Sequence, residues 1–154
     1  MLLSLFSVLR FWRIQIIFFD MYKPQYFSLF ELVDTNSTTL SNNIPDWDSV
    51  ENLLILCEKI LDPLRGAYGR PLFINSGYRS RFVNEFVGGV STSQHLLGCA
   101  ADISVGCDSS LSKLFDLAQE LNLPFDQLIY YKKRRFIHVS WSPVPRYQVI
   151  VRNG

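Results

Sequence analysis

The sequence predicts an α+β domain in which helices and mostly antiparallel strands occupy separate parts of the chain. Residues 46–64 and 109–121 carry apolar side chains at intervals of three and four, the spacing of a helix buried along one face. Residues 125–131 and 136–141 are apolar runs joined by a short basic turn, which is typical of an antiparallel hairpin. We therefore expect a small, mostly antiparallel sheet with helices packed on one side.

Length and composition limit the possible classes of protein. A chain of 154 residues is long enough to bury its own core as one domain, which we assign to residues 26–154. The net charge of +1 provides no field that would recruit nucleic acid. The basic run at 132–135 is typical of a solvated turn. The three cysteines are odd in number and widely spaced, which argues against a disulfide framework.

The N-terminal segment is strongly apolar. Two arginines and a glutamine interrupt residues 1–20, so the run falls short of the ~20 apolar residues that a membrane-spanning helix needs. A clear signal-peptide pattern is also missing. We interpret residues 1–25 as an apolar arm, or as an extension ahead of a true start at Met21, in preference to a membrane anchor or an export signal.

The first half of the domain is predicted to be mainly helical. Residues 26–33 suggest a short strand, turn and helix, and the polar residues 34–43 a surface loop. Asp46 or Asp48 can cap the next helix, and Pro63 is expected to kink or terminate it near its end. The expected buried face of this helix consists of Val50, Leu53, Leu54, Cys57, Ile60, Leu61 and Leu64.

Short elements and glycines follow in the middle of the chain. We expect a strand at 71–75, one or two helical turns at 81–87, a polar loop at 90–98 and a strand at 99–105. Gly88, Gly89 and Gly98 are assigned to the backbone turns between these elements.

Asp102 is the unusual residue of the strand at 99–105. Ala101 and Ile103 face one side of the strand, whereas Asp102 faces the other. A carboxylate in an apolar strand costs free energy unless it is paired or binds a metal, so we predict a functional role for Asp102. Cys99 faces the opposite side from Asp102, which disfavours a mixed cysteine and histidine site.

The last third is predicted to contain the second helix and three strands. Asp108 can cap the helix, and residues 146–151 follow the hairpin as a possible edge strand. The expected buried face of the helix consists of Leu111, Leu114, Phe115 and Ala118.

The chain contains two histidines, His95 in the polar loop and His138 in the hairpin. Two imidazoles and one carboxylate are a standard ligand set for a catalytic zinc, which keeps a fourth position for water. Zinc lowers the pKa of that water to about 7 and polarises a carbonyl as a Lewis acid. We therefore hypothesise that His95, Asp102 and His138 bind one Zn²⁺ ion, although histidines also serve purely structural roles.

Five motif blocks resemble a known family. The blocks are SGYRS at 76–80, GG at 88–89, SQHLLGCAAD at 93–102, FDQLI at 125–129 and IHVS at 137–140. In this order they resemble the zinc D-alanyl-D-alanine carboxypeptidase family of peptidoglycan peptidases, in particular its short single-domain forms from bacteriophages. The resemblance extends from about Tyr26 to Trp141. It implies a hedgehog/D-Ala-D-Ala-peptidase-like fold, with zinc on the sheet face away from the helices.

The resemblance also implies roles for individual residues. His95, Asp102 and His138 would be the zinc ligands. Arg79 would face the substrate and stabilise charge on the scissile carbonyl oxygen, since its guanidinium offers fixed donors. Ser93 would hydrogen-bond the substrate. The implied protein is a monomeric zinc metallopeptidase that cleaves peptidoglycan stem peptides at the bacterial cell wall, as a D,D-carboxypeptidase or endopeptidase, whether exported or delivered by a phage.

One feature of the family pattern is missing. Relatives usually carry an acidic residue near the second histidine as general base, but no Asp or Glu lies between Gln127 and His138. If the hairpin turns at Lys133-Arg134, Ile129 opposes His138 and Asp126 points away from the zinc face.

A one-residue slip in strand register would bring Asp126 to the zinc face instead. Asp126 is therefore a candidate base or a partner of the ligands, and Glu85 and Tyr131 are alternatives for proton transfer. Without a base, the protein would be a non-catalytic zinc-binding recognition module of the same fold. A third possibility is a structural domain without metal, in which Arg79 pairs with Asp102.

Overall fold

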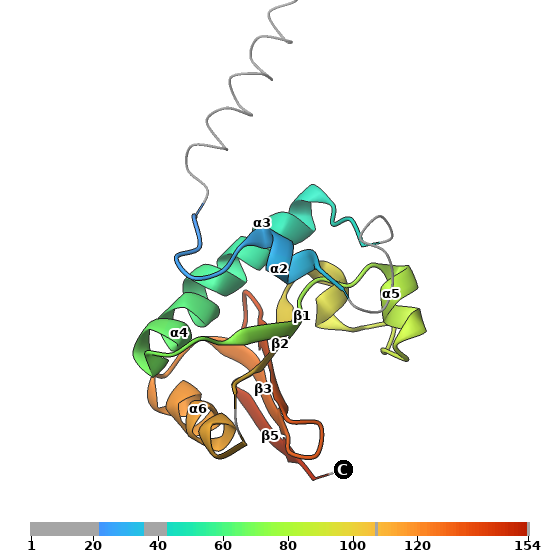
Figure 1. Cartoon of the computed structure of the whole chain (residues 1–154). Helices are drawn as coiled ribbons and strands as arrows, with labels where there is room; N and C mark the ends of the chain where they lie inside the picture. Colours follow the sequence, from blue (N-terminus) through green and yellow to red (C-terminus); the bar gives the residue numbers. More distant parts are fainter. Residues whose placement is uncertain (1–21, 36–42, 107, 154) are drawn as a thin grey trace, which may run out of the picture.

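The structure, a computed structural model, describes residues 22–35, 43–106 and 108–153 (Figure 1). The predictions for residues 1–20, for Met21 and for most of the loop at 34–43 lie outside these residues, as does Cys107, one of the three cysteines. The described chain is α+β, as predicted, with helices and one mixed sheet. None of its helices is both long and apolar enough to cross a membrane.

Five strands of the described chain form one sheet in the order β1-β2-β4-β3-β5. Three neighbouring pairs are antiparallel, while β5 runs parallel to β3. β4 ends beside the start of β3, and the chain crosses this end of the sheet before β5 begins, so β5 follows the direction of β3. The strands are β1 (Phe73–Ser76), β2 (Ala100–Ser104), β3 (Phe125–Tyr131), β4 (Phe136–Trp141) and β5 (Gln148–Arg152).

The predicted first helix is a continuous rod of three segments, α3 (Trp47–Leu56), the π-helical η2 (Cys57–Leu61) and α4 (Asp62–Tyr68). Asp46 caps its start by accepting a hydrogen bond from the Ser49 backbone N–H, as predicted.

Pro63 does not terminate this rod, because α4 continues to Tyr68. Pro63 lies in the first turn of α4, directly after the π-helical turn. That turn has already shifted the backbone pairing, with the Asp62 N–H donating to the Cys57 carbonyl. A proline at the start of a helical turn lacks a donor that would be unpaired in any case, so the rod tolerates it.

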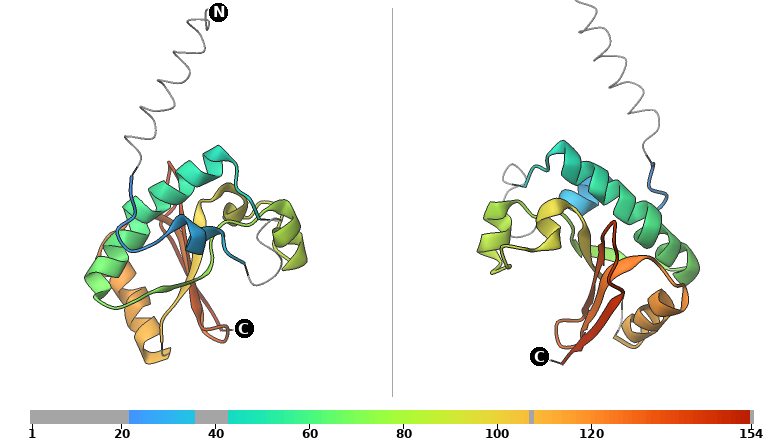
Figure 2. Two further views of the ribbon diagram at one scale, coloured as in Figure 1. Left: turned by 45° about the horizontal axis from the view of Figure 1, so that its top comes forward. Right: turned by 180° about the vertical axis from the view of Figure 1, so that it is seen from behind.

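The core lies between the sheet and the two long helical elements. The rod α3-η2-α4 and helix α6 (Asp108–Glu120) lie on one side of the sheet (Figure 2). The buried residues predicted for both helices are confirmed, except that Val50 is half-buried. Ala101 and Ile103 of β2 join this core, so Asp102 lies on the other face of the strand.

The remaining helices are short. Helix α2 (Leu29–Val33) begins at a capping box formed by Ser28 and Glu31. The helix predicted within 26–33 is confirmed, but the short strand predicted before it does not form. Helix α5 (Arg81–Phe86) is capped by Ser80 and is followed by the 3₁₀ turn η3 (Gln94–Leu97). Helix α5 and turn η3 lie within residues 76–102, which contain the first three motif blocks.

The buried Asp62 ties the start of the described chain to α4. Its carboxylate accepts hydrogen bonds from the Tyr22 hydroxyl at 2.6 Å and from the backbone N–H groups of Gln25 and Tyr26. The hydrogen bond to Asp62, with some burial, raises the pKa of Tyr22 to about 12. Tyr22 and Gln25, which belong to the predicted arm, therefore contact the domain.

Gly77 couples α2 to the SGYRS loop. A Cβ atom at Gly77 would lie 2.2 Å from the backbone oxygen of Leu32. The same oxygen accepts a hydrogen bond of 2.7 Å from the Tyr78 N–H. No side chain larger than hydrogen fits here without moving the backbone of α2.

We expect Gly77→Ala to lower the free energy of unfolding by about 1–3 kcal/mol, because the clash is with backbone rather than with a flexible side chain. Urea unfolding measures this change. Gly106→Ala is the matched control, since no heavy atom lies within 4 Å of a Cβ placed at Gly106. Equal stability of the two variants would contradict the proposed contact.

Candidate metal centre

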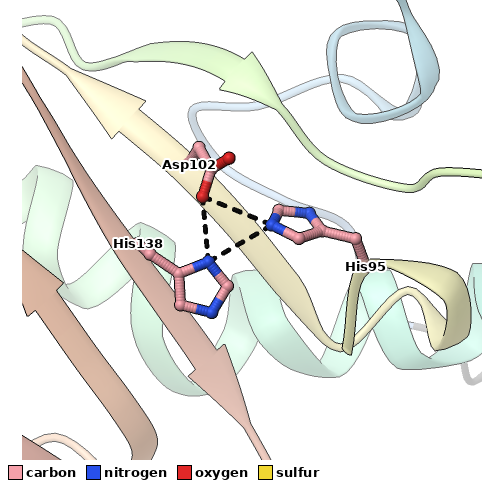
Figure 3. A group of neighbouring side chains, drawn as sticks. All are labelled: His95, Asp102 and His138. Atoms are coloured by element: carbon pink, nitrogen blue, oxygen red, sulfur yellow. Dashed lines mark hydrogen bonds and ion pairs between the residues drawn. The ribbon is translucent and has the colours of Figure 1, made fainter. Parts of the chain in front are cut away.

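Three segments bring His95, Asp102 and His138 together (Figure 3). Asp102 on β2 and His138 on β4 are direct partners in the antiparallel pairing of the two strands, so their side chains lie side by side on one face. His95 reaches them from η3, which ends at Gly98 in a left-handed conformation with φ of 70°. A Cβ on Gly98 would also lie 2.2 Å from the Ser49 backbone oxygen, so α3 and η3 pack closely at this point.

The three donor atoms form a tight triangle. Asp102 Oδ1 lies 3.3 Å from His95 Nε2 and 2.9 Å from His138 Nδ1, and the two nitrogens are 3.2 Å apart. Two ligands bound to one zinc at about 2.0–2.1 Å in tetrahedral geometry lie roughly 3.3 Å from each other. The residues therefore fit a zinc ion in both donor chemistry and spacing.

The orientation of His95 is set by its second nitrogen. His95 Nδ1 lies 2.6 Å from the Gly77 carbonyl oxygen. A carbonyl can only accept, so Nδ1 carries the proton and the lone pair of Nε2 faces Asp102 and His138. Hydrogen bonding of the outer histidine nitrogen to a carbonyl is a common way to orient a metal-binding imidazole.

Arg79 holds the other oxygen of Asp102. Its NH2 group donates to Asp102 Oδ2 at 2.6 Å, and its Nε donates to Ser76 Oγ at 2.7 Å. The Arg79 backbone N–H also donates to the His95 carbonyl. The two carboxylate oxygens therefore have different partners: Oδ2 accepts from Arg79, and Oδ1 lies next to the two histidines.

Burial and charge together favour the protonation states that a metal site needs. Burial lowers the pKa of His95, although Asp102 acts in the opposite direction, so the neutral imidazole is favoured. Burial alone would raise the pKa of Asp102. The electrostatic interactions of its carboxylate with His95 and His138 outweigh this effect and hold the Asp102 pKa well below its usual range. Neutral imidazole and ionised carboxylate are the forms that bind a divalent metal.

The three residues line a cleft of about 590 Å³. Ser93 lines this cleft with Arg79, and so do the side chains of Arg134 and Arg146. Asp102 is the one carboxylate among the described residues that form the lining. The cleft thus has an excess of positive charge.

Comparison with known proteins gives the chain a family. The family model for Peptidase M15 matches residues 25–140. This chain belongs to the Peptidase M15 family. The resemblance inferred from the motif blocks is thereby confirmed.

The chain is also similar to the zinc D-Ala-D-Ala carboxypeptidase of Streptomyces albus G. It is 36% identical to this chain over 84 residues, which are 54% of this chain and 32% of the relative. The chain thus matches about a third of the relative's length.

The hairpin of this M15 chain has the predicted register. Ile129 pairs with His138, and Tyr131 pairs with Phe136. Gln127 and these four residues all line the cleft, as their shared face predicts.

Asp126 lies where the register of β3 and β4 shifts, between Phe125 and Leu128. Its side chain is buried and does not belong to the cleft lining. Its carboxylate accepts hydrogen bonds from Arg146 and from Gln94 Nε2, the latter at 3.0 Å. Of the two other candidates for proton transfer, Tyr131 lines the cleft, whereas Glu85 is exposed and lies outside the cleft lining.

Arg146 and Gln94 are cleft residues that the sequence did not indicate. Arg146 lies after the last motif block, and no sequence pattern in that segment distinguishes it from an ordinary surface arginine. Gln94 lies inside the SQHLLGCAAD block beside His95, and this position was the available signal. Both residues act on Asp126, whose own position depends on the register shift in β3.

We expect the ion pair of Asp126 to contribute to stability in a pH-dependent way. Hydrogen bonds from Arg146 lower the pKa of Asp126, so the stabilisation is present above the unfolded-state pKa of about 3.9 and is lost as pH falls through the lower folded value. The free energy of unfolding of Asp126→Asn should therefore decrease less steeply below about pH 5 than that of the unaltered protein.

Chemical unfolding at several pH values measures this slope. Asp116→Asn, which alters an exposed carboxylate on α6, is the control and should keep the slope of the unaltered chain. An unchanged slope in Asp126→Asn would show that the ion pair does not contribute.

Proposed function

We propose that this chain is a zinc-dependent metallopeptidase that hydrolyses peptidoglycan stem peptides, as a D,D-carboxypeptidase or an endopeptidase. The observation that carries the proposal is the convergence of His95, Asp102 and His138 in the lining of an open cleft. Membership of the Peptidase M15 family and similarity to a protein named zinc D-Ala-D-Ala carboxypeptidase support it.

The ligand set has the form expected for catalysis rather than for structure alone. Structural zinc sites are usually closed by four protein ligands, whereas catalytic sites use three and leave one position open. Bound zinc supplies Lewis acidity and a source of hydroxide near neutral pH. The cleft gives a peptide access to the side of the triangle that the described protein groups do not cover.

Arg79 and Ser93 are the proposed substrate-binding residues. Arg79 is bound through Nε and NH2, which fixes its plane and leaves NH1 to donate to the oxygen of the scissile carbonyl as negative charge develops there. Ser93 lines the cleft directly before η3 and makes no side-chain cap for that turn, so its hydroxyl is free to bind the peptide backbone.

Two side chains compete for the proton-transfer role. Asp126 can act as the base only if it exchanges its Arg146 bonds for contact with the cleft. Tyr131 already lines the cleft and can donate a proton to the leaving amine. A decrease in kcat of about 10²-fold or more in Tyr131→Phe, with zinc content unchanged, would assign the transfer to Tyr131.

We expect the purified protein to bind one zinc ion per chain. His138→Ala and Asp102→Asn should both lose stoichiometric zinc, because the first removes a ligand and the second removes the negative charge of another. Elemental analysis after dialysis measures this content. Asp116→Asn is the matched control and should retain zinc, and full zinc content in His138→Ala would refute the assigned ligand set.

We expect hydrolysis of a peptide ending in D-Ala-D-Ala, or of a cross-linked stem peptide, with release of a free amine. A chelator should abolish the activity and added zinc should restore it. Absence of amine release with every substrate and metal condition, in protein that carries one zinc, would contradict the enzymatic proposal.

A non-catalytic zinc-binding recognition module is the second candidate. The specific observation in its favour is that Asp102 is the one carboxylate in the described cleft lining, and it is a proposed metal ligand. Such a module would bind stem peptides in a zinc-dependent manner and release no amine. A structural domain without metal would also contain the ion pair between Arg79 and Asp102. Measurement of the zinc content distinguishes such a domain from the two zinc-binding candidates.

The same proposal places the protein at the bacterial cell wall, in the periplasm or outside the cell, or delivered there by a phage. Its partner would be the peptide part of peptidoglycan, acted on by a monomer. Zymography on purified cell walls, with fractionated cells as the comparison, tests the location and the substrate, and size-exclusion chromatography tests the monomeric state.

A further inference from the structure

We propose that Arg146 binds a carboxylate of the peptide substrate and that Asp126 is the residue that positions Arg146 for this purpose. The inference rests on the proposed function and gives the cleft a second anchoring point for the peptide. It concerns the C-terminal segment after Trp141, which lies beyond the residues that the family model matches.

Arg146 is fixed through one edge of its guanidinium. Its Nε donates to Asp126 Oδ1 at 2.9 Å, its NH2 group donates to Asp126 Oδ2, and its backbone N–H donates to Oδ1 at 3.0 Å. The other edge, formed by NH1 and the second hydrogen of NH2, has no partner among the described residues. This edge belongs to a side chain that lines the cleft and is 58% exposed.

Asp126 itself cannot meet the substrate in this arrangement. The residue is 2% exposed, lies outside the cleft lining, and accepts a further bond from Gln94. A carboxylate that binds the Nε edge of an arginine holds the plane of the guanidinium and leaves the opposite edge available. Asp126 therefore acts through Arg146.

The segment that carries Arg146 is held on both sides. The Tyr147 ring packs edge-to-face against Phe125 with 5.9 Å between ring centroids, and β5 then pairs with β3. Gln148, the first residue of β5, accepts a hydrogen bond of 2.6 Å from the cleft residue Gln127. Arg146 is thus presented by ordered backbone rather than by a free tail.

The charge of the cleft indicates the chemical class of the group that Arg146 binds. Arg79, Arg134 and Arg146 line it, and Asp102 is the one acid among the described lining residues. Asp102 is already bound by Arg79 and lies against both histidines. A planar carboxylate matches the two parallel N–H groups of a guanidinium edge.

Stem peptides can present such a group at the C-terminus or as the α-carboxylate of a γ-linked glutamate. The test uses three probes on the metal-free full chain: N-acetyl-γ-D-glutamyl-L-lysyl-D-alanyl-D-alanine, its C-terminal amide, and the peptide amidated at the glutamate α-carboxylate. Isothermal titration gives the three affinities without any turnover.

We expect one of the two amidations to weaken binding to the unaltered protein by about tenfold or more, since it removes a charge-assisted pair. The same amidation should have little effect on binding to Arg146→Gln. Asp126→Asn should likewise lose the discrimination between acid and amide, with circular dichroism confirming that it is folded. Arg146→Lys, which keeps the charge but not the paired edge, should retain only part of it.

Arg152→Gln is the matched control, because Arg152 is an exposed arginine of the same segment that does not line the cleft. It should discriminate as the unaltered chain does. If Arg146→Gln responds to both amidations as the unaltered protein does, Arg146 is not the carboxylate-binding residue. Discrimination that depends on Arg146, in zinc-loaded protein that releases no amine, would uphold this inference and contradict the enzymatic proposal.

Discussion

The rest of the site depends on the contacts that the buried Asp102 carboxylate makes with Arg79, His95 and His138. One of its oxygens accepts a hydrogen bond from Arg79, and the other faces His95 and His138. An ionised group in an apolar strand is costly unless it is paired, so the surrounding structure has to supply partners on both oxygens. The fold meets this requirement from three directions: the SGYRS loop, the turn η3 and the strand β4.

Each direction has its own structural support. The pairing of β2 with β4 places His138 beside Asp102. The carbonyl of Gly77 orients His95, and the position of Gly77 is set by its close approach to the backbone of α2. The helical rod and α6 fill the opposite face of the sheet with apolar side chains, which leaves the Asp102 face open as a cleft. Because side chains alternate along the strands, the cleft residues lie on one face of the sheet and the core residues on the other.

Much of this arrangement could be predicted from the sequence because it depends on local periodicity. Alternation along β2 placed Asp102 opposite the core, and the turn of the hairpin placed Ile129 opposite His138. The continuation of the helix past Pro63 was less predictable, because a π-helical turn is not visible in the pattern of apolar residues. Arg146 was missed because its role arises from a crossover at the end of the sheet, and its partner Asp126 lies at a register shift that no local signal marks.

One zinc ion bound between His95, Asp102 and His138 would be the centre of the proposed site. X-ray absorption spectroscopy at the zinc edge of the purified protein tests this proposal most directly. We expect only nitrogen and oxygen neighbours of the zinc at about 2.0–2.2 Å, with the multiple scattering of two imidazoles. A sulfur neighbour at about 2.3 Å, or the signal of fewer than two imidazoles, would contradict it.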